Sequence, residues 1–192
     1  MNLDLTLRIE QFSAIISDAK VTDGQGIASK LADGLNLLRD HISQVQKNSK
    51  NLYIVGNGGS AGVAAHAVTD FFNVAKIRAS TLHESSLLTC MANDFGYENA
   101  AARMLAQLLN PGDVVIVISS SGNSPNMQNA ALVSKKNGAF VVTFSGFSSE
   151  NPLSKLGDLN IWLNSNDYGF VEIGHQFILH NIADRFNKSL IS

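Results

Sequence analysis

The sequence predicts an α/β protein in which a parallel sheet is covered by helices on both faces. Strand-like segments alternate with helical ones from residue 49 onward, an order typical of parallel sheets. The strands are continuous apolar runs, such as Val114–Ile118, as expected of strands buried on both faces. Two strands end in turns rich in glycine and serine, and ligands bind at this end of α/β sheets.

Length and composition indicate one domain, residues 1–192, with a helical segment at 1–48 and the α/β core at 49–192. The 14 basic and 16 acidic residues form no block of one sign and give a net charge of −2. We therefore expect no binding to nucleic acid or to a membrane. The single cysteine, Cys90, excludes an internal disulfide, and we expect it to be buried. With no signal-peptide pattern and no apolar run of about 18 residues, a cytoplasmic location is expected.

Two amphipathic helices are expected before the core, over Leu3–Ala19 and Ile27–Val45. The stretch Val21–Gly26 between them has the composition of a turn. Because both helices precede any strand, they could pack on another subunit. Covering their own sheet fits the pattern equally well.

The core begins with a strand at Leu52–Val55 and a helix that ends near Phe72. The other expected strands are Ala79–Leu82, Val114–Ile118, Phe140–Phe144 and Leu159–Leu163. The other expected helices are Glu84–Leu109 with an interruption at Asn93–Gly96, Pro125–Lys136, a short helix from Asn151, and Gly169–Leu190.

The first ligand-binding turn is Gly56-Asn57-Gly58-Gly59-Ser60-Ala61. Its glycines allow a ligand to approach the backbone, and Ser60 is placed to cap the following helix. The turn can be aligned with the dinucleotide fingerprint G-x-G-x-x-A. That site also needs an acidic residue about 20 positions further on, and Glu84 comes too late. We therefore expect a backbone cradle without a nucleotide cofactor.

The second turn is Ser119-Ser120-Ser121-Gly122-Asn123-Ser124-Pro125. Ser124 is placed to cap a helix, and Pro125 suits its first position. A helix that starts here stabilises an anion by about 0.3–1 kcal/mol, and by up to about 2 kcal/mol when partly buried. A serine-rich surface loop is the alternative, but the buried strand before the turn favours a phosphate pocket.

Four side chains could carry chemistry. His66 and Asp70 lie four residues apart and share a helix face, whereas Glu172 and His180 lie about 80° apart on the last helix. Taken singly, each could be a core histidine or a solvated charge. Together they could supply a general base and acid, or four ligands for a zinc-type ion. The remaining histidines are expected to be structural: His41, His83 and His175.

Four motifs in order resemble the phosphoheptose isomerase branch of the sugar isomerase (SIS) domain family, over nearly the whole chain. They are Gly56–Ala61, His66–Asp70, Ala92–Glu98, and Pro111–Val114 leading into the serine loop. The resemblance implies a three-layer α/β/α sandwich with a parallel five-stranded sheet, assembled as a homotetramer with active sites between subunits. It also implies conversion of sedoheptulose 7-phosphate to a heptose 7-phosphate for cell-envelope glycan (lipopolysaccharide) biosynthesis.

The same resemblance assigns roles by position. His66 and His180 match positions that can bind zinc, and His180 would also be the catalytic acid. Because Asp70 and Glu172 add two carboxylates, we expect zinc to be held by His66, Asp70, Glu172 and His180. The phosphate would be held by Ser119, Ser120, Ser121 and Ser124. The rest of the substrate would be bound by Asn57, Gly58, Gly59, Ser60, Asn93 and Asp94.

The chain departs from the family pattern at four positions in or near this site. Asp70 replaces a glutamate base, and Glu172 replaces a glutamine. Val74 and Phe170 replace two basic residues. Because a shift of about 1 Å in a catalytic group can cost about a hundredfold in rate, we expect Glu172 to take over or share the proton transfer with Asp70.

Two alternative functions stay open at this stage. One is a non-catalytic phosphosugar-binding scaffold, like the branch of the family that associates with the bacterial replication initiator. That branch lacks the histidine corresponding to His180, which this chain has. The other is an isomerase of a different sugar phosphate.

Overall fold

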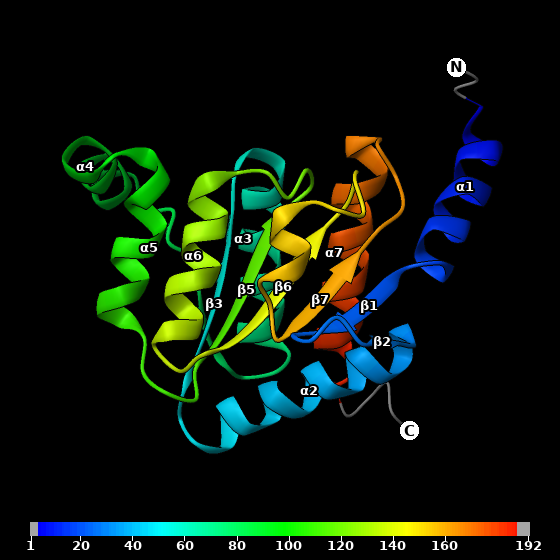
Figure 1. Ribbon diagram of the computed structural model, residues 1–192. Helices are drawn as coiled ribbons and strands as arrows, with labels where there is room; N and C mark the ends of the chain where they lie inside the picture. The colour runs from blue at the N-terminus through cyan, green and yellow to red at the C-terminus, as the bar shows by residue number, and fades with distance from the viewer. Residues whose placement is uncertain (1–3, 188–192) are drawn as a thin grey trace.

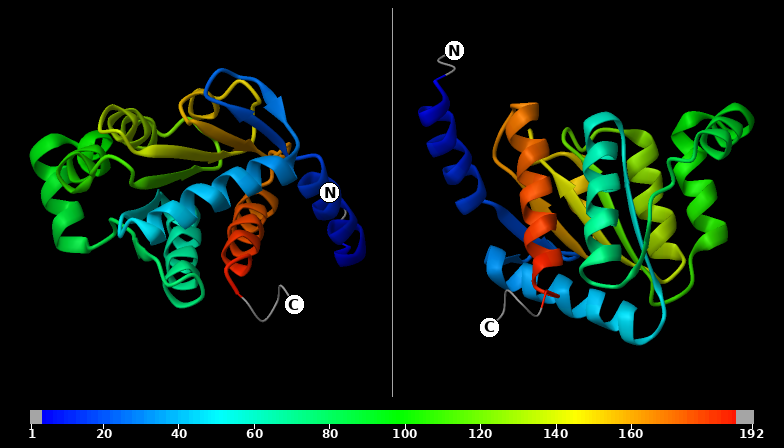
Figure 2. Two further views of the ribbon diagram at one scale, coloured as in Figure 1. Left: turned by 90° about the horizontal axis from the view of Figure 1, so that it is seen from below. Right: turned by 180° about the vertical axis from the view of Figure 1, so that it is seen from behind.

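Seven strands form one sheet in the order β2-β1-β7-β6-β5-β3-β4, and helices cover both of its faces (Figures 1 and 2). The computed structural model describes residues 4–187. The strands are β1 Lys20–Asp23, β2 Ala28–Ser29, β3 Asn51–Gly56, β4 Arg78–Ser80, β5 Val114–Ser119, β6 Phe140–Ser145 and β7 Leu159–Trp162. The helices are α1 Leu5–Ser17, α2 Leu31–Lys47, α3 Gly58–Asn73, α4 Ser85–Phe95, α5 Tyr97–Leu108, α6 Pro125–Lys136, the short 3-10 helix η1 Pro152–Lys155, and α7 Tyr168–Asp184.

The core lies in two layers because side chains alternate across the strands. Ile54 and Ile116 face α2, α3 and α7, whereas Val55 and Val117 face α5, α6 and η1. All six residues of β5 are buried, which agrees with its continuous apolar sequence. The predicted α/β class with layers on both faces is therefore confirmed.

The five strands expected from the sequence are present and parallel, from β7 through β6, β5 and β3 to β4. The turn expected at Val21–Gly26 is wrong, because Lys20–Asp23 forms β1, which pairs antiparallel with β7. The glycines that follow make a hairpin turn, and Asp23 Oδ1 accepts from the backbone nitrogens of Gln25 and Ile27. The second helix consequently begins at Leu31 instead of Ile27.

Leu3 and Leu190, the outer limits expected for the first and last helices, lie outside the described residues. Cys90 is exposed, contrary to expectation, because α4 has no residue buried within the described chain. No helix among residues 4–187 is long and apolar enough to cross a bilayer.

His175 is a buried structural residue, as expected. Its ring is completely buried, Nε2 lies 3.1 Å from the Ser145 carbonyl oxygen, and its edge packs on the Phe144 ring at 5.5 Å between centroids. Burial lowers the pKa of His175 to about 4. The folded protein therefore keeps this ring neutral at pH values where an unfolded chain would protonate it.

The depressed pKa of His175 predicts acid destabilisation between about pH 6.5 and pH 4. In that window His175 is protonated in the unfolded chain but not in the folded chain. The free energy of unfolding therefore falls as the pH falls, by up to about 3 kcal/mol from this group. Urea unfolding across the window, compared with His175→Gln, measures the contribution. The variant should show a shallower pH dependence, and equal slopes would contradict the assignment.

Candidate functional site

Two turns meet at the carboxyl edge of the sheet because β3 and β5 are parallel neighbours. Their register pairs Gly56 with Ile118, so the glycine turn and the serine loop start side by side. A pocket of about 210 Å³ opens between them. It is lined by Asn57, Gly58, Gly59, Ser60, Ile118, Ser119, Ser120, Ser121, Ser124, Tyr168 and Glu172.

Two helices begin at this pocket, and neither is capped by its own N-cap side chain. Asn57 precedes α3 and Ser124 precedes α6, and neither side chain accepts a hydrogen bond from its helix, both of which are described in full. First-turn N–H groups and the positive ends of two helix dipoles are thus available to an anion. Ser60 lies inside α3, so its expected role as a cap is wrong.

The serine hydroxyls of the loop line the same pocket, and none of them caps α6. Ser124 Oγ lies 3.4 Å from Ser119 Oγ instead of bonding its helix. Ser120 is 4 % exposed, and its Oγ has no hydrogen-bond partner within residues 4–187. Because buried hydroxyls are rarely left unpaired and Ser120 lines the pocket, its hydroxyl is a candidate donor to an acceptor such as a phosphate oxygen.

Glycine is required in the first turn for two reasons. Gly58 has φ +52°, a conformation that L side chains rarely adopt. At Gly59 a Cβ would overlap the carboxylate oxygens of Glu172, which lies directly against this residue. The turn therefore admits the Glu172 carboxylate to the N-terminal end of α3.

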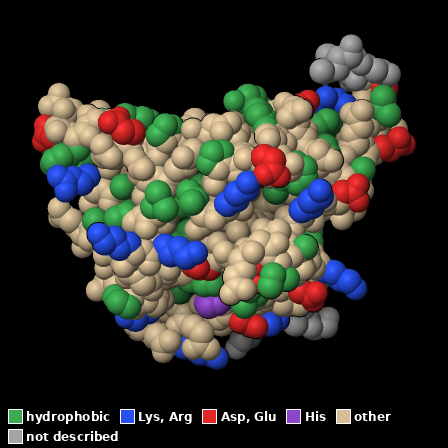
Figure 3. Space-filling view, in the orientation of Figure 1, with side chains coloured by type: hydrophobic (Ala, Val, Ile, Leu, Met, Phe, Trp, Pro, Cys, Tyr) green, Lys and Arg blue, Asp and Glu red, His purple; other side chains and the backbone are tan. Residues whose placement is uncertain are grey.

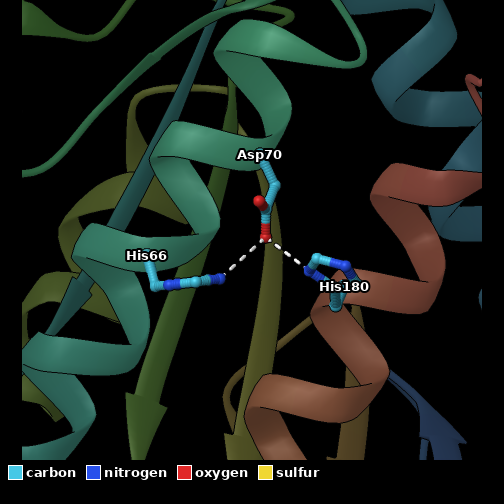
Figure 4. Close-up of side chains that lie close together, drawn as sticks. All are labelled: His66, Asp70 and His180. Atoms are coloured by element: carbon cyan, nitrogen blue, oxygen red, sulfur yellow. Dashed lines mark hydrogen bonds and ion pairs between the residues drawn. The ribbon is translucent and has the colours of Figure 1, made fainter.

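Three of the expected catalytic or metal-binding side chains converge between α3 and α7 (Figure 4). One Asp70 oxygen lies 2.8 Å from His180 Nδ1 and 3.5 Å from His66 Nε2. One ligand atom from each residue lies within 4.8 Å of the others. Both histidine side chains are at least half exposed, so an ion or a substrate can reach them. Two nitrogens and a carboxylate form a donor set typical of catalytic zinc with an open position.

Other predicted residues lie elsewhere. Glu172 is in the pocket and is not a member of the histidine–aspartate cluster found among the described residues, contrary to the four-ligand expectation. Eight residues of helix, a rise of about 12 Å, separate it from His180. Asn93 and Asp94 do not line the pocket: both are exposed on α4, where Asn93 Nδ2 donates to Asp94 Oδ1 at 2.9 Å.

Sequence reasoning missed three residues at the site. Tyr168 lines the pocket from the first position of α7. Asn126 and Tyr97 bond to the side chain of Asn57. Asn126 directly follows the serine loop, and this position in the sequence could have indicated that it lies near the site. The contact of Tyr97 depends on how α5 packs, and no local pattern reveals it.

Comparison with known proteins agrees with this geometry. A family model described as SIS domain matches residues 21–146. The phosphoheptose isomerase of Geotalea daltonii is 34% identical over 186 residues, which cover 93% of this chain and 94% of that protein. The chain therefore belongs to the SIS domain family, in its phosphoheptose isomerase branch.

Two solved structures share the fold. Phosphoheptose isomerase from Neisseria gonorrhoeae superposes with a TM-score of 0.81 at 20% identity, over 95% of this chain and 97% of that one. The corresponding values for the enzyme from Francisella tularensis are a TM-score of 0.82 and 19% identity, over 96% of each chain.

Because the Ser120 hydroxyl is unpaired among the described residues, removing it should weaken phosphate binding without lowering the stability of the fold. Ser120→Ala should weaken binding of inorganic phosphate roughly tenfold or more, because a hydrogen bond to a charged group is lost. Its unfolding midpoint should stay unchanged, since Ser120 Oγ bonds nothing in the described protein. Isothermal titration and thermal unfolding measure the two effects.

Ser134→Ala is the matched control. Ser134 is also buried, but its hydroxyl donates to the Ala130 carbonyl oxygen at 2.7 Å, outside the pocket. This variant should lose stability and keep phosphate binding. Unaltered phosphate binding by Ser120→Ala would refute the role assigned to the pocket.

Proposed function

We propose that the protein is an aldose–ketose isomerase of a sugar phosphate, converting sedoheptulose 7-phosphate to a heptose 7-phosphate for cell-envelope glycan and lipopolysaccharide synthesis in the cytoplasm. One observation carries the proposal: α3 and α7 line the anion pocket near their N-terminal ends and carry the His66–Asp70–His180 cluster further along. An anchored sugar phosphate would lie along the same two helices. The name of the relatives, phosphoheptose isomerase, supports this substrate.

Phosphate would be held without a cationic side chain. The residues that line the pocket, all within the described range, include no lysine or arginine. Backbone N–H groups of α3 and the hydroxyls of Ser119, Ser120, Ser121 and Ser124 would supply the donors. On the face of the molecule in Figure 3, positive and negative side chains are interspersed, which agrees with recognition by local donors instead of a broad basic surface.

Isomerisation needs a base that takes a proton from carbon and an acid that serves the oxygens. Asp70 is held between two histidines, whereas Glu172 faces the pocket and forms no hydrogen bond with the described residues. We assign carbon proton transfer to Glu172, shared with Asp70. Without bound zinc, His180, oriented through its Nδ1 by Asp70, would be the acid. Each group would contribute about 10²–10⁴-fold in rate.

Zinc would be bound by His66, Asp70 and His180, the residues whose donor atoms already converge. Bound zinc would polarise the sugar carbonyl and stabilise negative charge on its oxygen. Glu172 would then be left for proton transfer, since it lies outside the cluster.

A homotetramer would cover apolar side chains that a single chain exposes. Ile9 on α1, Phe72 on α3, and Ile173 and Phe177 on α7 are each more than half exposed. These three helices are neighbours on the rear face (Figure 2). In such an assembly Asn93 and Asp94, which are exposed on α4 and do not line their own pocket, would line the site of a neighbouring copy.

A related sugar phosphate is the second candidate substrate. Val74 and Phe170 offer no charge to a sugar hydroxyl at positions where the family is basic. The nearest replacement for Phe170 is Arg8, whose guanidinium lies 4.0 Å from the Phe170 ring centroid. It also pairs with Asp167 at 2.9 Å, so its charge is already partly neutralised.

During turnover in deuterated water, we expect the enzyme to incorporate deuterium at C1 or C2 of sedoheptulose 7-phosphate. NMR measures this incorporation. Glu172→Gln should lower turnover about a hundredfold, because the base is lost while the shape is kept. Glu150→Gln, an exposed carboxylate paired with Lys155 outside the pocket, is the matched control and should act as wild type. Deuterium exchange with other ketose phosphates but not with sedoheptulose 7-phosphate would favour the second candidate substrate. No exchange with any sugar phosphate would favour a non-catalytic, phosphosugar-binding scaffold. Full turnover by Glu172→Gln would show that Asp70 is the base instead.

Native mass spectrometry of protein prepared without chelator should show four chains and one zinc ion per chain. His180→Ala should lose zinc, because it removes one of three converging donors, and should remain tetrameric. Arg39→Ala, an exposed residue paired with its neighbour Asp40, is the control and should keep both metal and assembly. Metal-free wild-type protein would exclude the zinc proposal, and monomers would exclude the tetramer.

A further inference from the structure

The side chain of Asn57 is bonded away from the helix that it precedes. Asparagine is among the strongest N-cap residues, because its Oδ1 accepts from the second or third N–H of the helix. Here Asn57 Oδ1 accepts instead from Asn126 Nδ2 at 2.8 Å and from Tyr97 Oη at 2.9 Å. Asn57 Nδ2 donates back to Asn126 Oδ1 at 2.9 Å. The amide is thus held by three hydrogen bonds.

These partners come from two other helices. Asn126 lies in the first turn of α6 and is 5 % exposed, so its surroundings fix its orientation. Tyr97 opens α5, and its ring is half exposed. The three residues therefore join the glycine turn, the start of α6 beyond the serine loop, and α5 at the rim of the anion pocket.

We propose that Asn126 and Tyr97 are positioning residues that keep the Asn57 side chain off the N-terminus of α3. The N–H groups of Gly59 and Ser60, which an asparagine cap would otherwise occupy, then stay free for the phosphate. This inference rests on the proposed function, since it gives the free N–H groups to that ligand. It also explains why a residue type that caps helices well leaves this helix uncapped.

A restraint on Asn57 and a merely structural link between the loops predict opposite changes in the exposure of the Gly59 and Ser60 amides. If Asn126 only held the two turns together, its removal would loosen the pocket and leave the amides of Gly59 and Ser60 exposed. If it restrains Asn57, its removal lets Asn57 rotate and cap α3. The amides of Gly59 and Ser60 then become protected, and the ligand must displace the new cap.

The test uses the full chain, inorganic phosphate and two variants, Asn126→Ala and Tyr97→Phe. We expect Asn126→Ala to weaken phosphate binding about fivefold to tenfold, the affinity equivalent of a typical cap. Tyr97→Phe, which removes one donor only and keeps the ring, should cause a smaller loss. In the absence of phosphate, hydrogen exchange at the Gly59 and Ser60 amides should slow in both variants. Unchanged or faster exchange would overturn the proposal.

A double-mutant cycle and a control complete the test. In the Asn57→Ala background no side chain can rotate onto α3, so Asn126→Ala should have no further effect on phosphate affinity. An equal loss in both backgrounds would overturn the proposal in favour of a structural link. Asn129→Ala is the matched control: Asn129 also joins α6 to α5, donating to the Glu98 carbonyl oxygen at 2.9 Å, but lies outside the pocket. It should bind phosphate as wild type.

Phosphate binding by the wild-type protein and by the single variants separates the proposed function from this inference. Wild-type protein that binds neither inorganic phosphate nor a sugar phosphate would overturn the proposed function and this inference with it. Wild-type binding that Asn126→Ala and Tyr97→Phe leave unaltered would overturn the inference alone.

Discussion

The parallel pairing of β3 with β5 is the constraint on which the site depends. It places the ends of both strands at one edge of the sheet, so two turns about 60 residues apart meet there and form the pocket together with the start of α7. Because β5 is buried along its whole length, neither turn can move without disturbing the core. The first-turn N–H groups and the serine hydroxyls are therefore held in place before a ligand arrives.

The electrostatic character of the pocket follows from that rigidity. Dipoles fixed by the fold can hold an anion where no cationic side chain lines the pocket. The one acidic or basic side chain there is that of Glu172, which a phosphate bound as proposed would approach. A carboxylate that opposes ground-state binding is reasonable if it is needed for proton transfer, and the neutral donors around it limit the repulsion.

Much of the fold was predictable because its signals are local. The apolar run of β5 and the boundaries of α6, Pro125–Lys136, are visible in the sequence itself. The strand at Lys20–Asp23 was missed because its turn-like composition acquires strand geometry only by pairing with β7. The burial of Cys90 was mispredicted because sequence cannot show that α4 lies at the edge of the core, with no residue fully buried. At the site, the spacing of His66 and Asp70 placed them on one face, but the hydrogen bonds of Asn57 depend on three elements distant in sequence.

Helix α7 has a consequence for selectivity. It presents Tyr168 and Glu172 at the pocket and His180 at the cluster, on one rigid scaffold. In the proposed function, a ligand anchored by its phosphate would extend along this scaffold, with its carbonyl end between the Glu172 carboxylate and the His180 imidazole. The helix would then select by carbon-chain length: a three-carbon sugar phosphate bound at the same anchor would be too short to reach the imidazole.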